Sequence, residues 1–177
     1  MVRHHVRACV SVLALTVLSA AATRPAAAQQ GVDPHVAFDR LKSLAGTWEG
    51  PAGDEKTGPP ATVVYRVASG GTVVQETLFP GTPHEMISMY HISDGNLVLT
   101  HYCAAGNQPR MSLDAKASSA ERLVFAFDGG TNFDPARDPH IHSGVIEFKG
   151  DTLHNEWASW QGGKEGRHEV FFLRRKN

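Results

Sequence analysis

The feature that most constrains this chain is a long succession of short apolar segments separated by turn residues. Apolar and polar side chains tend to alternate within each segment, which is typical of β-strands with one buried face. No helical pattern of useful length interrupts the series. The strands expected are Thr47–Glu49, Ala61–Ala68, Thr72–Phe79, Glu85–Ile92, Asn96–Cys103, Arg110–Lys116, Arg122–Asp128, Ile141–Lys149, Thr152–Trp160 and His168–Arg174.

The joints between these segments carry turn chemistry, as in Asp94-Gly95-Asn96, Gly150-Asp151 and Gly162-Gly163. Such short connections join antiparallel neighbours, because parallel pairs need crossovers of about a dozen residues or more. Short antiparallel strands in one domain form a sandwich or a barrel, and closure removes the exposed sheet edges. We therefore expect an all-β fold, a single closed antiparallel β-barrel of about ten strands. A longer turn-rich stretch, Gly129 to Pro139, is expected to form a loop at the rim.

One short helix is expected before the strands, over Pro34–Leu44. Asp33 has a side chain suited to an N-cap, and proline is well tolerated in the first helical turn. Val36, Phe38 and Leu41 recur at helical spacing, so we expect this face to be apolar and buried.

The first 28 residues have the three-part pattern of a secretory signal peptide. Met1 to Arg7 is basic, Ala8 to Ala22 is almost wholly apolar, and Ala26-Ala27-Ala28 supplies the small residues of a cleavage site. The apolar run is too short to span a bilayer, which takes about 20 apolar residues. We expect a signal peptide over residues 1–28, one barrel domain over residues 29–177, and export to the periplasm or the extracellular space.

The charge and the cysteines limit the partners and the source of stability. Removal of residues 1–28 takes away three arginines and no acid, so 14 of the 17 basic side chains remain against 18 acidic ones. The resulting net charge of about −4 argues against nucleic acid or an anionic membrane as a partner. Cys103 is then the remaining cysteine, so a hydrophobic core and not a disulfide framework has to stabilise the fold. The oligomeric state stays open.

A short motif after the expected helix carries a family resemblance. Gly46-Thr47-Trp48 resembles the Gly-x-Trp that opens the first strand of lipocalin-like (calycin) barrels, in which a basic residue of the last strand packs across the Trp. Arg174 or Arg175 in "FFLRRKN" is the candidate for that contact, through a cation–π interaction. The resemblance implies a barrel that holds one small ligand or is filled by its own side chains.

Two further resemblances concern parts of the chain. The stretch "THYCAAGNQPRM" is similar to a segment of uncharacterised exported bacterial proteins with lipocalin-like or unknown-function domains, which implies no activity. The spaced glycines after Trp48 resemble those of the haem-binding nitrobindin branch, although Asp54-Glu55-Lys56 interrupts the glycine run. This resemblance implies haem as a candidate ligand, and His168 is the histidine nearest the C-terminus. The residue pattern by itself predicts no cofactor.

The segment "LTHYCAAGNQPRM", Leu99 to Met111, concentrates polar side chains where one strand ends and the next begins. Ala104 to Pro109 is expected to turn the chain and to aim Asn107, Gln108 and Arg110 at a barrel mouth. Arg110 offers a bidentate clamp for an anion, and the two amides offer donors and acceptors. The alternative is that these side chains only form the turn and bond nearby backbone. The ligand-binding residues predicted in this segment are His101, Tyr102, Asn107, Gln108 and Arg110.

A second polar group lies in "DTLHNEWASWQGG". Strand alternation places His154 and Glu156 on one face and Asn155 and Trp157 on the other. If the first face is internal, His154 and Glu156 form an acid–base or ligand-orienting pair, and both are predicted binding residues. If that face is external, they form an ordinary solvated pair.

Several histidines and the cysteine suggest metal binding. Zinc takes four ligands at about 2.0–2.3 Å, so His101, Cys103, His140 and His142 are weak metal candidates that depend on which strands are neighbours. The alternative is a hydrogen-bonded, partly buried His101 and a small core cysteine. A Cys–His nucleophile would also need a third orienting group, which the sequence does not signal.

These observations predict an exported β-barrel that binds a small molecule, of unknown identity, at a polar mouth. One alternative is an enzyme on a lipocalin-like scaffold that uses His/Glu acid–base chemistry, and another is a haem- or metal-binding barrel. Fold analogy does not choose among them. Convergence of His101, His142 and His154 on one cavity would favour the enzyme or the metal site.

Overall fold

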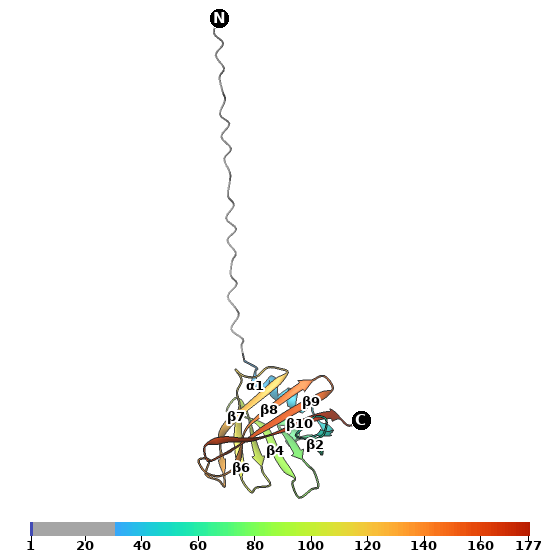
Figure 1. The fold of residues 1–177 in the computed structure, drawn as a ribbon, viewed down its shortest axis with the longest axis vertical. Coiled ribbons are helices and arrows are strands. Elements are labelled where there is room, and N and C mark those ends of the chain that lie inside the picture. The colour runs from blue at the N-terminus through green and yellow to red at the C-terminus, as the bar shows by residue number, and fades with distance from the viewer. Residues whose placement is uncertain (2–30) are drawn as a thin grey trace.

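The computed structural model describes Met1 and residues 31–177. The predicted signal peptide therefore lies, apart from Met1, outside the described residues. Within the described part, one α-helix precedes ten antiparallel strands that close into a barrel (Figure 1). This confirms the predicted fold class. None of the helices in this part is long and apolar enough to cross a membrane.

Each of the expected strands is present, and the helix is shorter than expected. The helix is α1 (Pro34–Lys42), and a 3₁₀ turn, η1 (Ser69–Gly71), joins the second and third strands. The strands are β1 (Gly46–Pro51), β2 (Pro60–Ala68), β3 (Val73–Leu78), β4 (Met86–Ser93), β5 (Asn96–Tyr102), β6 (Gln108–Leu113), β7 (Arg122–Thr131), β8 (His140–Lys149), β9 (Thr152–Gln161) and β10 (Lys164–Arg175).

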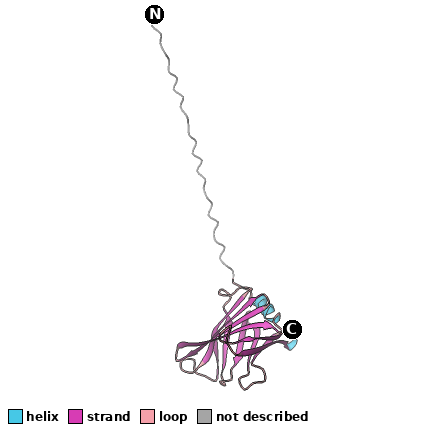
Figure 2. Ribbon diagram, turned by 45° about the vertical axis from the view of Figure 1, so that its right-hand side comes forward, coloured by secondary structure: helices cyan, strands magenta, loops and turns pink. Residues whose placement is uncertain are grey.

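The strands are arranged as an up-and-down barrel in which chain neighbours are also sheet neighbours. The barrel closes where β1 pairs with β10, with Trp48 opposite Arg175. The hairpins at the late strands are the longest, and Figure 2 shows the strands curving into a barrel with the helix at one end. Because each strand is tilted and paired on both sides, its side chains alternate between the lumen and the outer face.

The helix covers one end of the barrel. Asp33 caps it as predicted, since its carboxylate accepts hydrogen bonds from the backbone N–H groups of His35 and Val36 at 2.8 and 3.2 Å. Phe38 and Leu41 are buried as expected. The expectation for Val36 is wrong, because its side chain is 53% exposed and the neighbouring Ala37 faces the core instead.

The Trp of the Gly-x-Trp motif plugs this same end. Trp48 is buried, and its indole N–H donates to the carbonyl of Leu44 at 2.8 Å. Arg175, and not its neighbour, covers the ring, with its guanidinium carbon 4.5 Å from the ring centroid. The same guanidinium donates to the carbonyls of Ser43 and Ala45 at 2.8 and 2.7 Å. The predicted contact between a C-terminal arginine and Trp48 is confirmed, and it ties the last strand to the helix end.

The pattern of burial decides which strand faces line the lumen. In β5, Leu99 and His101 are buried on the inner side. In β9, Asn155 and Trp157 are buried, whereas the side chain of Glu156 between them is part-exposed and bonds on the outer face. Most of the lumen is apolar, and the exceptions form the candidate site.

Candidate functional site

A group of polar side chains lies in the middle of the apolar lumen, and we call it the polar layer. Its members come from β2, β3, β4, β5 and, across the lumen, β9. All are almost completely buried. They are Tyr65, Glu76, Ser88, Tyr90, His101, Asn155 and Trp157.

Glu76 is the centre of the layer. Its two carboxyl oxygens accept the phenol O–H of Tyr65 at 2.6 Å and that of Tyr90 at 2.7 Å. The Asn155 amide reaches across the lumen and donates to the oxygen of Tyr65 at 2.7 Å and to Glu76 at 3.2 Å. Strand register places Tyr65 and Ser88 directly opposite Glu76 on its two neighbouring strands. One carboxyl therefore connects both walls of the barrel.

His101 extends the layer toward Trp157. Its Nδ1 lies 3.0 Å from the hydroxyl of Ser88, the residue opposite it in the β4–β5 ladder. The imidazole stacks on the indole of Trp157 with ring centroids 6.0 Å apart. The indole in turn lies against Gly144 of β8, where an added Cβ would come within 2.4 Å of a ring carbon. Only glycine at this position leaves room for Trp157 inside the barrel.

Burial sets the protonation of the layer. It lowers the pKa of His101 to about 4, so the imidazole is neutral near pH 7. Burial also raises the pKa of Glu76, against the opposing effect of hydrogen bonds from Tyr65, Tyr90, Ser88 and Asn155. When the single Ser88 proton is donated to Glu76, Nδ1 of His101 must donate to Ser88, which leaves Nε2 as an acceptor.

Three atoms of the polar layer lack a hydrogen-bond partner among residues 31–177. They are Nε2 of His101, Oδ1 of Asn155 and Nε1 of Trp157, and all three are shielded from solvent. A buried polar group without a partner costs about 1–3 kcal/mol, and such groups are rare in native proteins. These atoms are one imidazole nitrogen, one amide oxygen and one indole N–H donor.

Two of the predicted binding residues join loops at the end of the barrel opposite α1. Asn107 is buried, and its amide donates to the carbonyl of Pro139 at 2.8 Å. The side-chain oxygen of Gln108 accepts from Thr131 at 3.0 Å and from Asn132 at 2.6 Å. These contacts fasten the β5–β6 hairpin to the loop between β7 and β8, at the rim. Their amides hold the mouth of the barrel in shape.

Tyr102 and Arg110 lie on the outer face. Tyr102 is 49% exposed, and Arg110 forms an ion pair with Asp128 at 2.9 Å. Alternation makes this unavoidable for Tyr102, because its neighbour His101 points into the lumen. Of the residues predicted in the "LTHYCAAGNQPRM" segment, His101 alone belongs to the polar layer.

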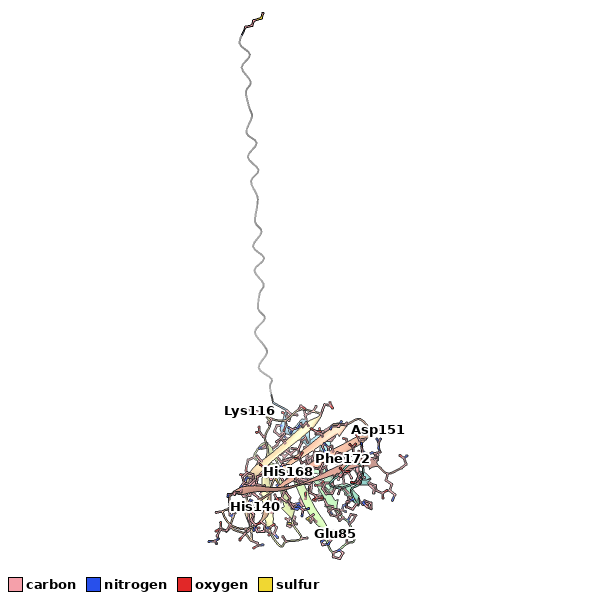
Figure 3. The ribbon with its side chains drawn as sticks, in the orientation of Figure 1. Glu85, Lys116, His140, Asp151, His168 and Phe172 are labelled. Carbon is pink, nitrogen blue, oxygen red and sulfur yellow. The ribbon has the colours of Figure 1, made fainter. Side chains whose placement is uncertain are left out.

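His154 and Glu156 are also on the outer face, and they bond to different partners. His154 stacks on Phe172 at 4.8 Å between centroids and lies 3.2 Å from Glu147. Glu156 contacts His168 instead. Figure 3 labels His168 and Phe172 at separate points along β10. The structure therefore does not bring His154 and Glu156 together as an acid–base pair.

The four metal candidates lie in three different places. Nε2 of His140 is 3.0 Å from Nδ1 of His142 at the start of β8. The thiol of Cys103 lies 3.9 Å from the sulfur of Met86, and His101 sits in the polar layer. Within the described residues, no three His, Cys, Asp or Glu side chains are arranged to hold a metal ion.

The histidine considered for haem does not fit that role. Both ring nitrogens of His168 contact carboxylates on the outer face, one from Glu156 and one from Glu165 at 2.6 Å. An axial ligand needs a free ring nitrogen that faces the bound haem. Neither ring nitrogen of His168 is free, so this residue does not fit the role of a haem ligand.

No protein-family model matches this chain, and no curated protein matches it either.

Most of the polar layer was not among the predicted site residues, although the sequence carries a signal for it. In β3, Glu76 has the same strand phase as the apolar Val74 and Leu78. In β9, Asn155 has the same phase as Leu153. A polar residue in the buried phase of a strand must find partners inside the barrel.

Proposed function

We propose that this protein is an exported binding protein with a calycin-like barrel, and that it takes a small neutral molecule with a hydroxyl or amide group into the lumen. The observation that carries this proposal is the set of three unpartnered polar atoms in the polar layer. Each belongs to a side chain that is at least nine-tenths buried, so a ligand would have to enter the barrel to bond to these atoms.

The pattern of donors and acceptors defines the ligand. In the tautomer in which Nδ1 of His101 donates to Ser88, Nε2 calls for a donor, as does Oδ1 of Asn155, and the indole N–H of Trp157 calls for an acceptor. A primary amide supplies two N–H donors and one carbonyl, and a hydroxyl supplies one donor and an acceptor. The aromatic rings of Trp157 and His101 provide a flat apolar surface beside these groups.

The charges in the layer favour a neutral ligand. A carboxylate or phosphate would lie near the carboxyl of Glu76, and none of the seven side chains of the layer carries a stable positive charge. An ammonium group offers three donors and no acceptor, so it would leave the Trp157 N–H unpaired. A neutral molecule that both donates and accepts avoids both penalties.

In this proposal the ligand enters at the end of the barrel opposite α1. The rim loops there are held by Asn107 and Gln108, so the mouth keeps its shape while a ligand passes. In this proposal the segment that contains them supplies the frame of the mouth, and His101 supplies the contact to the ligand.

A second candidate function is acid–base catalysis on the bound molecule. It is favoured by the sequence of contacts from Glu76 through Ser88 to His101, which ends in a neutral imidazole with an unpartnered Nε2. A neutral imidazole positioned by a second group is suited to act as a general base. The two functions differ in outcome, since a binding protein releases its ligand unchanged and an enzyme releases a product.

The indole N–H of Trp157 offers a direct test of the binding proposal. Nitrogen–proton correlation spectra of isotope-labelled protein resolve the three tryptophan indoles, and Trp48→Phe and Trp160→Phe variants assign them. Benzamide and benzyl alcohol are expected to move the Trp157 signal saturably, whereas benzoate is expected to leave it in place. A one-dimensional proton spectrum of the same sample shows whether benzamide is returned intact or hydrolysed.

Variants on the two faces of the barrel provide the matched comparison. His101→Phe and Asn155→Leu are expected to weaken benzamide binding about tenfold or more, equivalent to about 1.4 kcal/mol. His154→Phe, on the outer face, is expected to bind as the native protein does. An unmoved Trp157 signal, or equal binding by the His101 and His154 variants, would overturn the proposal. The Trp48 indole signal reports that each variant has kept its fold.

A further inference from the structure

A second cleft lies at the helix-covered end of the barrel, away from the open mouth. It has a volume of about 540 Å³ and is bounded by α1, the turn between β8 and β9, and the end of β10. Asp151, at its edge, is labelled in Figure 3 at the end of the barrel opposite Glu85 and His140. This volume is within the range of about 300–1,000 Å³ for ligand pockets and much larger than a bare inorganic ion needs.

The floor of this cleft is apolar and aromatic. Leu44, Trp48 and Phe148 contribute to it, and all three are part of the hydrophobic core. Because the core holds them, these side chains are fixed in place, and Arg175 and Arg40 lie over the rings of Trp48 and Phe148.

The wall of the cleft carries guanidinium groups. Arg40 projects from α1, and its guanidinium carbon lies 4.4 Å from the ring centroid of Phe148. Arg174, from the end of β10, lines the same cleft. Arg175 also lines it, but its guanidinium is already bonded to two backbone carbonyls. Arg40 and Arg174 are therefore the two groups available to a ligand.

Neither of these two arginines has a carboxylate partner within residues 31–177. In the described part of the chain, neither Arg40 nor Arg174 forms an ion pair. Asp151 is the acidic side chain that lines the cleft, and no ion pair joins it to either arginine within residues 31–177. Four arginines elsewhere on the barrel do pair with acids, namely Arg110, Arg122, Arg137 and Arg167.

We propose that this cleft binds a small amphipathic oxyanion. Its apolar body would pack against the parts of Leu44, Trp48 and Phe148 that Arg40 and Arg175 leave uncovered, and its carboxylate or phosphate would lie between Arg40 and Arg174. Guanidinium groups suit this role because their planar donors match the two oxygens of a carboxylate or phosphate. The site is independent of the lumen, which favours neutral molecules.

The indole N–H signal of Trp48 reports ligand binding in this cleft, as the signal of Trp157 reports ligand binding in the lumen. The probes are 2-naphthoate, 2-naphthyl phosphate, uncharged 2-naphthylmethanol and inorganic phosphate. We expect the two naphthyl anions to move the Trp48 indole signal saturably and to leave the Trp157 signal in place. The tighter of the two shows whether the site prefers a carboxylate or a phosphate.

Charge-removing variants complete the test. Arg40→Gln combined with Arg174→Gln is expected to weaken binding of the tighter naphthyl anion about tenfold or more. Arg137→Gln, in the loop between β7 and β8, is expected to have no effect. If the double variant does not fold, Arg174→Gln alone is expected to weaken binding, because that exposed side chain makes no bond within residues 31–177.

Four results would overturn the proposal. They are an unmoved Trp48 signal, equal binding by the double variant and Arg137→Gln, equally tight binding of 2-naphthylmethanol, and equally tight binding of inorganic phosphate. The first two would show that the cleft does not bind these anions through Arg40 and Arg174. The third would show that the negative charge of the ligand is not needed, and the fourth that its apolar body is not needed. None of these results concerns ligand binding in the lumen, so a failure of this proposal can be distinguished from a failure of the proposed function.

Discussion

The carboxyl of Glu76 accepts the phenol O–H of Tyr65 at 2.6 Å in the centre of the barrel, where both side chains are buried. Tyr90 and Asn155 bond to the same carboxyl from two other strands. A single acidic group thus satisfies donors from β2, β4 and β9. Its removal would leave the hydroxyls of Tyr65 and Tyr90 buried without this acceptor.

Glu76→Leu is expected to destabilise the protein by about 3–5 kcal/mol, because it leaves the hydroxyls of Tyr65 and Tyr90 unpaired in an apolar lumen. The measurement is the free energy of unfolding in urea. Adding Tyr65→Phe and Tyr90→Phe to the same chain is expected to recover part of the loss, since no orphaned hydroxyl then remains. Exposed Glu55→Gln serves as the control, with a change under about 0.5 kcal/mol. A loss equally small for Glu76→Leu would contradict the central role of this carboxyl.

Gly144→Ala is expected to destabilise the barrel by about 1–3 kcal/mol, because the new methyl group would overlap the ring of Trp157. In a Trp157→Phe background the same substitution is expected to cost much less, since the smaller ring leaves space. A thermal-unfolding double-mutant cycle measures this coupling. Additive effects would show that Gly144 and Trp157 are not packed as described.

The stability contributed by His101 is expected to fall as the pH falls. Burial lowers its pKa from the usual 6.5 to about 4, so the unfolded chain takes up a proton before the folded protein does. Between about pH 7.5 and about pH 4.5 this difference amounts to about 2–3 kcal/mol. Glu76, whose pKa is raised, acts in the opposite direction, so native protein has to be compared with His101→Gln, in which Glu76 is kept.

The measurement for His101 is the unfolding free energy of both proteins across this pH range. The native protein is expected to lose its advantage over His101→Gln on acidification. In proton spectra, the His101 ring signal is expected to stay at its neutral position down to about pH 5. A ring that titrates near 6.5 would show that His101 is not buried beside Ser88 and Trp157.

Arg175→Lys is expected to destabilise the protein by about 1–2 kcal/mol, because a lysine cannot bond both Ser43 and Ala45 while it covers Trp48. Arg174→Lys, the neighbouring control, is expected to change the unfolding free energy by less than about 0.5 kcal/mol. Equal effects at the two positions would contradict the contact assigned to Arg175.

The fold could be predicted because its signal is local. Alternation with a period of two and turn residues such as Asp94-Gly95 mark each strand, and short connections leave antiparallel pairing as the simple arrangement. The ends of the strands were predicted less well than the strands themselves. The last strand, β10, begins at Lys164 and not at the expected His168, because the Gly162-Gly163 turn is tight. Closure of the barrel between β1 and β10 is a long-range contact. In the sequence, its one sign was the expected contact of Trp48 with Arg174 or Arg175.

The candidate site could be predicted only in part, because alternation separates two faces without saying which is internal. His101 and Tyr102 were predicted together, yet neighbouring positions on a strand necessarily point to opposite sides. His154 and Glu156 share a face, but that face is external. The contact from Asn155 to Glu76 joins residues far apart in the chain, and no local pattern encodes such a pairing.

A crystal structure of the protein soaked in benzamide tests the central claim most directly. The account predicts density for one guest in the lumen, with its amide about 2.7–3.2 Å from Nε2 of His101, Oδ1 of Asn155 and Nε1 of Trp157. A lumen in which these three side chains bond to one another, with benzamide elsewhere or not bound, would contradict it.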